Sequence, residues 1–234
     1  MNIRVRFSKH GCLKFIGHLD VMRYFQKAMR RAEIDMCYSE GFSPHMIMSF
    51  ASPLGLGLES DGEYMDISVK QSPSSKEAVE RLNAVMAEGI EVLSWRELPE
   101  NSKNAMASVA GADYEVRFRE GYELEEGWKK KLEEFLALPE IRIMKETKKG
   151  EQEVDIRPWV YDYHIKDQTI FLKVFAGSVH NLKPELLLKA FGDWAGVEIP
   201  AFALLICRKE MYADEGSETE RKLVALEELG EEIG

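Results

Sequence analysis

Cysteine is scarce in this 234-residue sequence, and its spacing excludes several kinds of site. The three cysteines, Cys12, Cys37 and Cys207, are odd in number and far apart. They fit thiols in a reducing cytosol better than a disulfide framework. No CxxC, HExxH or clustered Cys/His motif occurs, so we expect no zinc or iron–sulfur site, no other metal and no cofactor.

Long apolar runs are also missing. No stretch reaches the roughly 18 apolar residues that a membrane-spanning helix needs. The first residues, MNIRVRFSKHG, alternate like a strand and lack the apolar core of a signal peptide. We therefore expect a cytoplasmic protein with no membrane partner.

Acidic residues are almost absent from the start of the chain. Residues 1–31 contain eight Lys or Arg and one acidic residue, Asp20, for a net charge of +7, while the whole chain carries −10, so the remainder carries −17. An acidic body with one basic segment can concentrate a polyanion on that segment and repel it elsewhere. The plainer interpretation is an uneven surface charge; we favour a localised polyanion site.

Residues 18–32 have the pattern of a basic amphipathic helix. The apolar residues that recur at helical spacing are Met22, Phe25, Met29 and Ala32. The cations on the opposite side, within a sector of about 100°, are Arg23, Lys27, Arg30 and Arg31. A charge run is usually a solvated helix face, but these cations have little acidic interleaving, and we expect them to contact phosphates.

The stretch from Ser39 to Gly57 is rich in Gly, Ser and Pro and predicts a long loop. Long ordered loops in compact domains are often functional. The loop is not a P-loop, because no GxxxxGK[ST] is present. We expect four residues to line the site beside the basic helix: His18, Ser39, Ser43 and His45.

The order of elements predicts an α+β fold of two tandem ferredoxin-like (βαββαβ) units, the second with an extra β-hairpin. Residues 1–100 would form the first unit, with a helix over 18–32 and strands near 34–38 and 63–70. Residues 109–212 would form the second, with helices over 125–138 and 184–194. Residues 213–234, with eight acidic and two basic residues, predict an acidic tail that is a loosely docked helix or disordered.

Asp155 to Trp159 contains an arginine before a proline and next to a tryptophan. Such an arginine can grip a phosphate or stack on a base. An arginine paired with Asp155 and a tryptophan in the core is the plainer interpretation, which we favour slightly. Arg157 is kept as a candidate phosphate contact.

Several of these segments resemble the radical-SAM-linked domain family of unknown function. They are His18-Leu19-Asp20 through Arg30-Arg31-Ala32, Tyr38-Ser39-x-Gly41-Phe42-Ser43-Pro44-His45, Ser49-Phe50-Ala51-x-Pro53-Leu54-x-x-Gly57, Gly62-Glu63-Tyr64 and Asp155-Ile156-Arg157-Pro158. The resemblance extends to about Tyr212. It implies a stand-alone member that acts with a radical-SAM enzyme in trans, since the chain has no CxxxCxxC motif, and it implies no known activity.

We expect an RNA-binding protein, with tRNA or rRNA as the ligand, that acts with a radical-SAM partner and has no activity of its own. Tyr38 or Phe42 would stack on a base. Two tandem ferredoxin-like units are also found in CRISPR repeat-processing endonucleases, which suggests RNA by fold analogy alone.

Two alternatives stay open. A metal-independent ribonuclease would use His18 and His45 as acid and base, which requires both imidazoles to reach one phosphate. A protein–protein adaptor without nucleic acid would dock a partner through the acidic tail and four apolar loop residues: Met46, Ile47, Met48 and Phe50.

Overall fold

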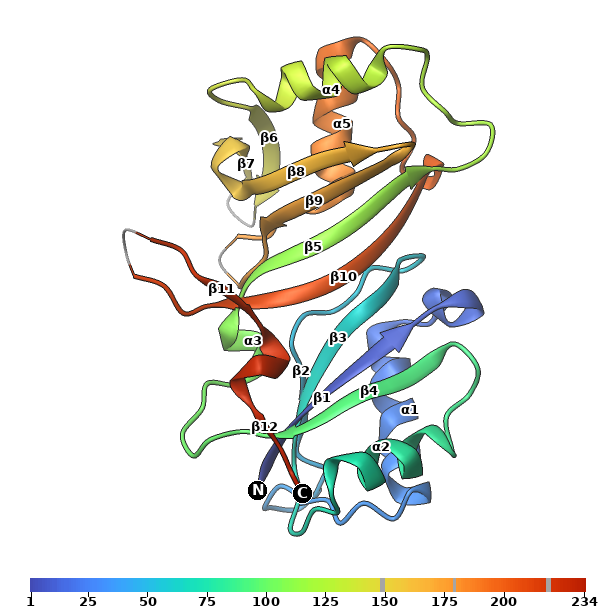
Figure 1. Ribbon diagram of the computed structural model, residues 1–234, viewed down its shortest axis with the longest axis vertical. Helices are drawn as coiled ribbons and strands as arrows, with labels where there is room; N and C mark the ends of the chain where they lie inside the picture. Colours follow the sequence, from blue (N-terminus) through green and yellow to red (C-terminus); the bar gives the residue numbers. More distant parts are fainter. Residues whose placement is uncertain (148–149, 179, 218–219) are drawn as a thin grey trace. The chain divides into compact units, whose positions relative to one another are not determined.

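The computed structural model shows a mixed α+β fold built mostly of antiparallel strands (Figure 1). The structure describes residues 1–147, 150–178, 180–217 and 220–234. The chain forms two compact units: unit 1 comprises Met1–Ala112 and Arg208–Gly234, and unit 2 comprises Asp113–Cys207. Strands β5 (Val109–Phe118) and β10 (Leu204–Asp214) each contribute residues to both units.

The first part of unit 1 has the order strand, helix, strand, strand, helix, strand. The elements are β1 (Asn2–Lys9), α1 (His18–Arg31), β2 (Met48–Phe50), β3 (Glu59–Ser68), α2 (Ser75–Asn83) and β4 (Ile90–Glu97), with a 3-10 turn, η1 (Gly11–Phe15), before α1 and a short helix, α3 (Ala105–Ser108), after β4. β1 lies between β3 and β4 and pairs antiparallel with both. β2 pairs antiparallel with β3, and β10 is the next neighbour of β3.

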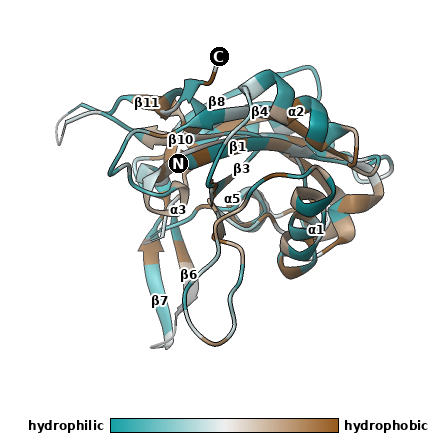
Figure 2. Cartoon of the chain, turned by 90° about the horizontal axis from the view of Figure 1, so that it is seen from below, coloured by the Kyte–Doolittle hydropathy of each residue, from teal (hydrophilic) through white to brown (hydrophobic). Residues whose placement is uncertain are grey.

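One face of this sheet carries the core of unit 1. Alternate residues of β1, namely Ile3, Val5 and Phe7, are buried in one cluster with Phe25 of α1 and Leu82 of α2. Figure 2 shows hydrophobic and hydrophilic residues along both helices, as in amphipathic helices. Each buried apolar side chain of this size contributes about 1.5–3 kcal/mol, so the cluster holds α1 firmly on the sheet.

The opposite side of β1 contacts the C-terminal segment, drawn in red in Figure 1. This segment contains β11 (Leu223–Ala225), η4 (Leu226–Leu229) and β12 (Glu231–Glu232); β11 pairs with β10 and β12 with β4. Leu226 is fully buried. Arg4 Nη1 donates to the Leu226 carbonyl at 3.1 Å, and Arg6 forms an ion pair with Glu227 at 2.8 Å.

The C-terminal segment therefore differs from the expected acidic tail. Where the structure describes it, the segment is neither a loosely docked helix nor disordered, because a buried leucine and sheet pairing at both ends fix it to unit 1. Unit 1 is consequently discontinuous in sequence, in contrast to the continuous division that the sequence suggested.

In unit 2, the strands follow the order β10-β5-β9-β8. Its elements after β5 are α4 (Trp128–Leu136), β6 (Arg142–Thr147), β7 (Gly150–Asp155), η2 (Arg157–Trp159), β8 (Val160–Lys166), β9 (Thr169–Phe175), α5 (Pro184–Ala195) and η3 (Ala201–Ala203). β6 and β7 form a separate antiparallel hairpin, at the place where the sequence predicted additional strands.

The second strand of unit 1 is not where the sequence predicted it. The strand expected over 34–38 is reduced to isolated bridges, Met36 with Val69 and Tyr38 with Met46. β2 instead lies inside the predicted loop, where Phe50 pairs with Met65 of β3. Buried Phe50 contributes an apolar side chain to the core, and this packing overrides the turn-rich composition around it.

Candidate functional site

Helix α1 turns its cations to solvent. Gly17 is the N-cap and Asp20 lies in the first turn, where a carboxylate suits the positive helix end. The buried residues of the helix are Val21, Phe25, Ala28 and Met29. The exposed cations are Arg23, Lys27, Arg30 and Arg31. Arg23 lies 3.5 Å from Asp20, and within the described ranges no side-chain hydrogen bond or ion pair occupies the other three, which leaves them available to an external anion.

The loop after α1 contains a small hairpin, residues 38–46, which we call the Phe42 hairpin. The Ser39 N–H donates to the His45 carbonyl at 2.9 Å, and the His45 N–H donates to Ser39 Oγ at 3.1 Å. Ser39 Oγ also lies 2.8 Å from His45 Nδ1. Between these residues, the Phe42 ring is completely exposed, so the hairpin holds an aromatic ring in solvent.

The Phe42 hairpin lies at the same end of the sheet as the last turn of α1. In the antiparallel β1–β3 pair, Ser60 marks the end near Lys9 and Ser68 marks the other end. α1 starts after Lys9 and runs back along the sheet (Figure 1). The chain then reaches Ser68, whose carbonyl accepts from the Cys37 N–H at 2.8 Å. The last cations of α1 and the exposed ring therefore occupy one end of unit 1.

His18 and His45 do not come together. His18 is the first residue of α1 and packs edge-on against Phe50, with ring centroids 5.1 Å apart. His45 lies in the Phe42 hairpin, beyond the other end of α1, and the 14 residues of that helix span about 20 Å. An acid and a base acting on one phosphate must both lie within hydrogen-bond reach of it. The geometry gives the ribonuclease alternative no support.

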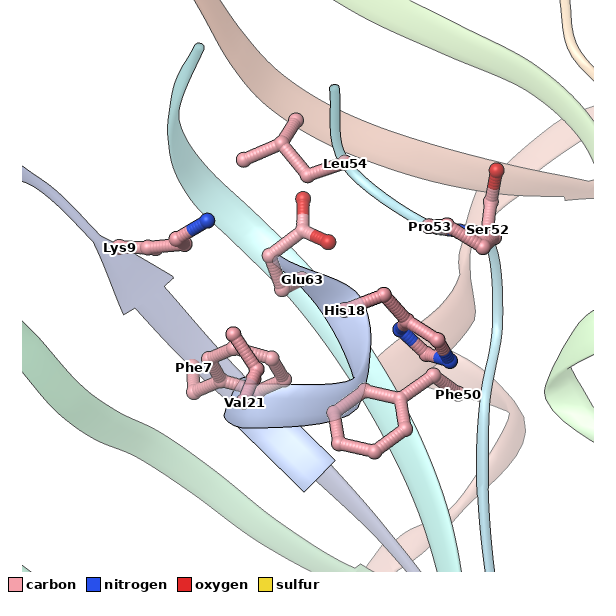
Figure 3. A pocket seen from close by; sticks show the side chains of 9 residues that line it. All are labelled: Phe7, Lys9, His18, Val21, Phe50, Ser52, Pro53, Leu54 and Glu63. Carbon is pink, nitrogen blue, oxygen red and sulfur yellow. The ribbon is translucent and has the colours of Figure 1, made fainter. Parts of the chain in front are cut away.

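A small pocket opens at the first turn of α1 (Figure 3). Its lining residues are Phe7, Lys9, His18, Val21, Phe50, Ser52, Pro53, Leu54 and Glu63. Its volume of about 20 Å³ is close to the space that one water molecule occupies. Figure 3 shows aromatic rings on one side of the pocket and the side chains of Lys9 and Glu63 on another.

Three charged side chains are buried at this pocket. Glu63 and Arg208 form a two-point ion pair, with Nε–Oε1 at 2.8 Å and Nη2–Oε2 at 2.6 Å, and Arg208 Nη2 also donates to the Ser52 carbonyl at 2.9 Å. Lys9 is 3% exposed, and its Nζ donates to the Ile16 carbonyl at 2.9 Å. Burial lowers the pKa of Lys9, against the opposing effect of the Glu63 carboxylate.

A family model described as an uncharacterized protein conserved in bacteria (DUF2344) matches residues 2–184. The chain belongs to this family. The match includes α1, the Phe42 hairpin and all nine lining residues of the pocket; Arg208, the ion-pair partner of Glu63, lies outside it.

Comparison with solved structures gives a distant likeness. A chain in the crystal structure of a Cbf5-Nop10-Gar1 complex matches with 12% identity and a TM-score of 0.48, over 89% of the DUF2344 chain and 48% of its own length. The DUF2344 chain thus spans about half the length of that chain. Comparison with the curated proteins found no match.

The other predicted site residues have structural roles in this DUF2344 chain or lie in solvent. Ser39 and His45 hydrogen bond to each other, whereas Ser43 is exposed. In unit 2, the Arg157 N–H donates to Asp155 Oδ1 at 3.0 Å, and Arg157 Nη1 donates to the Val160 carbonyl at 3.1 Å. The Asp155 carboxylate thus accepts from the backbone of Arg157, and the Arg157 guanidinium donates to a backbone carbonyl.

Over the described ranges, no group of three or more His, Cys, Asp or Glu side chains is arranged to hold a metal ion. Among the helices described, none combines the length and the apolar character needed to cross a membrane.

The sequence analysis did not identify the three charged residues at the pocket as site residues. Lys9 continues the odd-numbered positions of β1, whose residues Ile3, Val5 and Phe7 face the core. That parity was a usable signal, since side chains two apart in a strand share a face. Glu63 and Arg208 are far apart in sequence, and nothing in the sequence links them before β3 and β10 are placed side by side.

Proposed function

We propose that this protein binds RNA through the exposed face of α1, with Phe42 stacking on an unpaired base. The observation that carries the proposal is the pairing of exposed, largely unpartnered cations with a fully exposed aromatic ring at one end of unit 1. Cations that follow a phosphate backbone, together with an aromatic platform, are the usual means of binding single-stranded nucleic acid. The acidic remainder of the chain favours binding at this face alone.

We also propose a fold type for unit 1, a class of RNA ligand and a protein partner. The βαββαβ order and the β4-β1-β3-β2 arrangement of unit 1 support a ferredoxin-like unit. We propose tRNA or rRNA as the ligand and a radical-SAM enzyme in trans as the partner, on the sequence resemblance described above. In this scheme the protein presents RNA and works in the cytoplasm with no reaction of its own.

The adaptor alternative has less support. Of its four proposed docking residues, Met46 and Phe50 are buried, Met48 is half-buried and Ile47 alone is exposed. An apolar docking surface needs side chains that are free to meet a partner, and three of these four side chains already pack in unit 1.

The test is a titration of total cellular RNA at low and moderate salt, read by fluorescence anisotropy. Lys27→Glu/Arg30→Glu reverses two exposed cations for which no intramolecular partner is found in the described residues, and we expect it to abolish most binding. Lys130→Glu/Lys131→Glu on α4 makes the same change in net charge at exposed positions of unit 2 and serves as the control. Equal loss in both variants, or no binding by the native protein, would refute the proposal.

A further inference from the structure

The buried charges at the pocket do not cancel. Glu63 neutralises Arg208, since both of its carboxylate oxygens accept from that guanidinium. Lys9 then leaves one positive charge in excess, in a site that is walled by Phe7 and Phe50. A buried charge is costly unless it is paired. The site therefore favours an anion.

Hydrogen-bond donors are also in excess. The Lys9 ammonium has three N–H donors, and the Ile16 carbonyl is its one acceptor in the described part of the chain. His18 is half-buried, lines the pocket and contacts Phe50, and across the same described ranges its imidazole makes no hydrogen bond. Two polar side chains at one pocket thus have unused donors.

The position of the pocket in the fold also favours an anion. His18 lines it and is also the first residue of α1, so the positive end of the helix dipole lies at the pocket. That end of a helix stabilises phosphate and other anions. The 14-residue helix is long enough for its aligned peptide dipoles to add.

The size of the pocket limits what can enter. A volume of about 20 Å³ admits one oxygen-sized group. A phosphate can insert one oxygen and leave the others at the mouth. A phosphate monoester or inorganic phosphate carries about −1.5 to −2 charge near neutral pH, more than the single charge of a phosphodiester, so the excess positive charge at the pocket favours the monoester or the free ion.

We propose that the pocket binds a phosphate monoester or inorganic phosphate, with one oxygen between Lys9 and His18. The site is separate from the RNA-binding face, because it lies at the opposite end of α1 from the Phe42 hairpin. Phosphate binding at this pocket does not depend on RNA binding by α1.

Isothermal titration of inorganic phosphate into the protein, in a phosphate-free buffer near neutral pH, tests the proposal. We expect saturable binding that Lys9→Met weakens at least about tenfold, which corresponds to about 1.4 kcal/mol. His18→Phe keeps the ring against Phe50, removes the donor and should weaken binding several-fold. Lys76→Met, at an exposed position of α2, makes the same charge change and should bind phosphate like the native protein.

Circular dichroism confirms that each variant is folded, and Lys9→Gln replaces Lys9→Met if the latter is not. No saturable binding of phosphate to the native protein, equal binding by the native and Lys9 variants, or equally tight binding of acetate would each overturn the proposal.

Short RNAs with a 5′-phosphate or a 5′-hydroxyl distinguish the sources of the phosphate. An added affinity from the 5′-phosphate that Lys9→Met removes identifies an RNA end as the ligand. Saturable binding of inorganic phosphate with no such gain identifies a free phosphate or a small phosphorylated molecule. Lys27→Glu/Arg30→Glu should leave the binding of inorganic phosphate intact. A failure of RNA binding can therefore be distinguished from a failure of phosphate binding.

Discussion

Phe42 holds its entire ring in solvent at the tip of a hydrogen-bonded hairpin. We predict that Phe42→Ala weakens RNA binding by about 1–3 kcal/mol, the range for one stacked base. Stability should change by less than about 0.5 kcal/mol, as for other surface positions. Phe15→Ala removes another exposed ring, 67% exposed and on the turn before α1, and should leave RNA affinity unchanged. Anisotropy titration with an unstructured RNA measures both, and an equal effect of the two variants would contradict stacking at Phe42.

The buried pair Glu63–Arg208 joins two strands of unit 1. We predict that Glu63→Gln lowers the free energy of unfolding by about 3–5 kcal/mol, because it removes the carboxylate that balances the buried Arg208 charge. The double variant Glu63→Leu/Arg208→Met should lose much less, since it removes both charges. Urea unfolding measures the difference. A double variant that is as unstable as the single one would show that packing, rather than the balance of the two charges, dominates.

Lys9 gives the stability of the protein a pH dependence. Its pKa is lowered in the folded state by burial, so the unfolded chain binds more protons as pH approaches the ordinary lysine value of 10.5. Native stability relative to Lys9→Met should therefore rise as pH increases through the lowered pKa, with the gain complete above that ordinary value. Urea unfolding of both proteins across this range measures the difference, in which the other lysines and the tyrosines cancel. A difference that does not change with pH would contradict the burial of a charged amine.

At the scale of elements, the predictable parts are those whose pattern is local. The 3.6-residue spacing of apolar residues and cations placed α1 almost to the residue, with an expected range of 18–32 and an observed range of His18–Arg31. The sequence did not predict strand β2, because three residues are too few to show alternation inside a turn-rich segment. The sequence also did not predict the docking of the C-terminal segment. Its acidic composition is a stronger signal than Leu226, the leucine that anchors it.

The burial of Leu226 leads to a prediction about the stability of the protein. Leu226 is 0% exposed, whereas Leu56 in the loop before β3 is 66% exposed. Leu226→Ala should destabilise the protein by about 2–5 kcal/mol, the usual cost of emptying a leucine site in a core. Leu56→Ala should change stability by no more than about 0.5 kcal/mol. Thermal and urea unfolding of the two variants test this, and a harmless Leu226→Ala would mean that β11 and β12 hold the segment by backbone pairing alone.

At the scale of the whole molecule, charge sets the salt response. The chain carries −10 overall, yet the proposed RNA face has four cations: Arg23, Lys27, Arg30 and Arg31. If each neutralises one phosphate of a single strand, the logarithm of the affinity should fall against the logarithm of salt concentration with a slope of about −3. Anisotropy titrations over a range of salt give this slope. A slope near zero would exclude phosphate contacts as the source of affinity.

The two-part construction of unit 1 has a consequence for synthesis on the ribosome. Residues 113–207 form a continuous unit, whereas residues 1–112 find their partner segment only in residues 208–234. Until that segment emerges, β4 lacks β12 at its edge and the buried site of Leu226 is empty. The part of the chain that is made first therefore completes its fold last, and the exposed edge of β4 is the surface that a nascent-chain chaperone would need to protect.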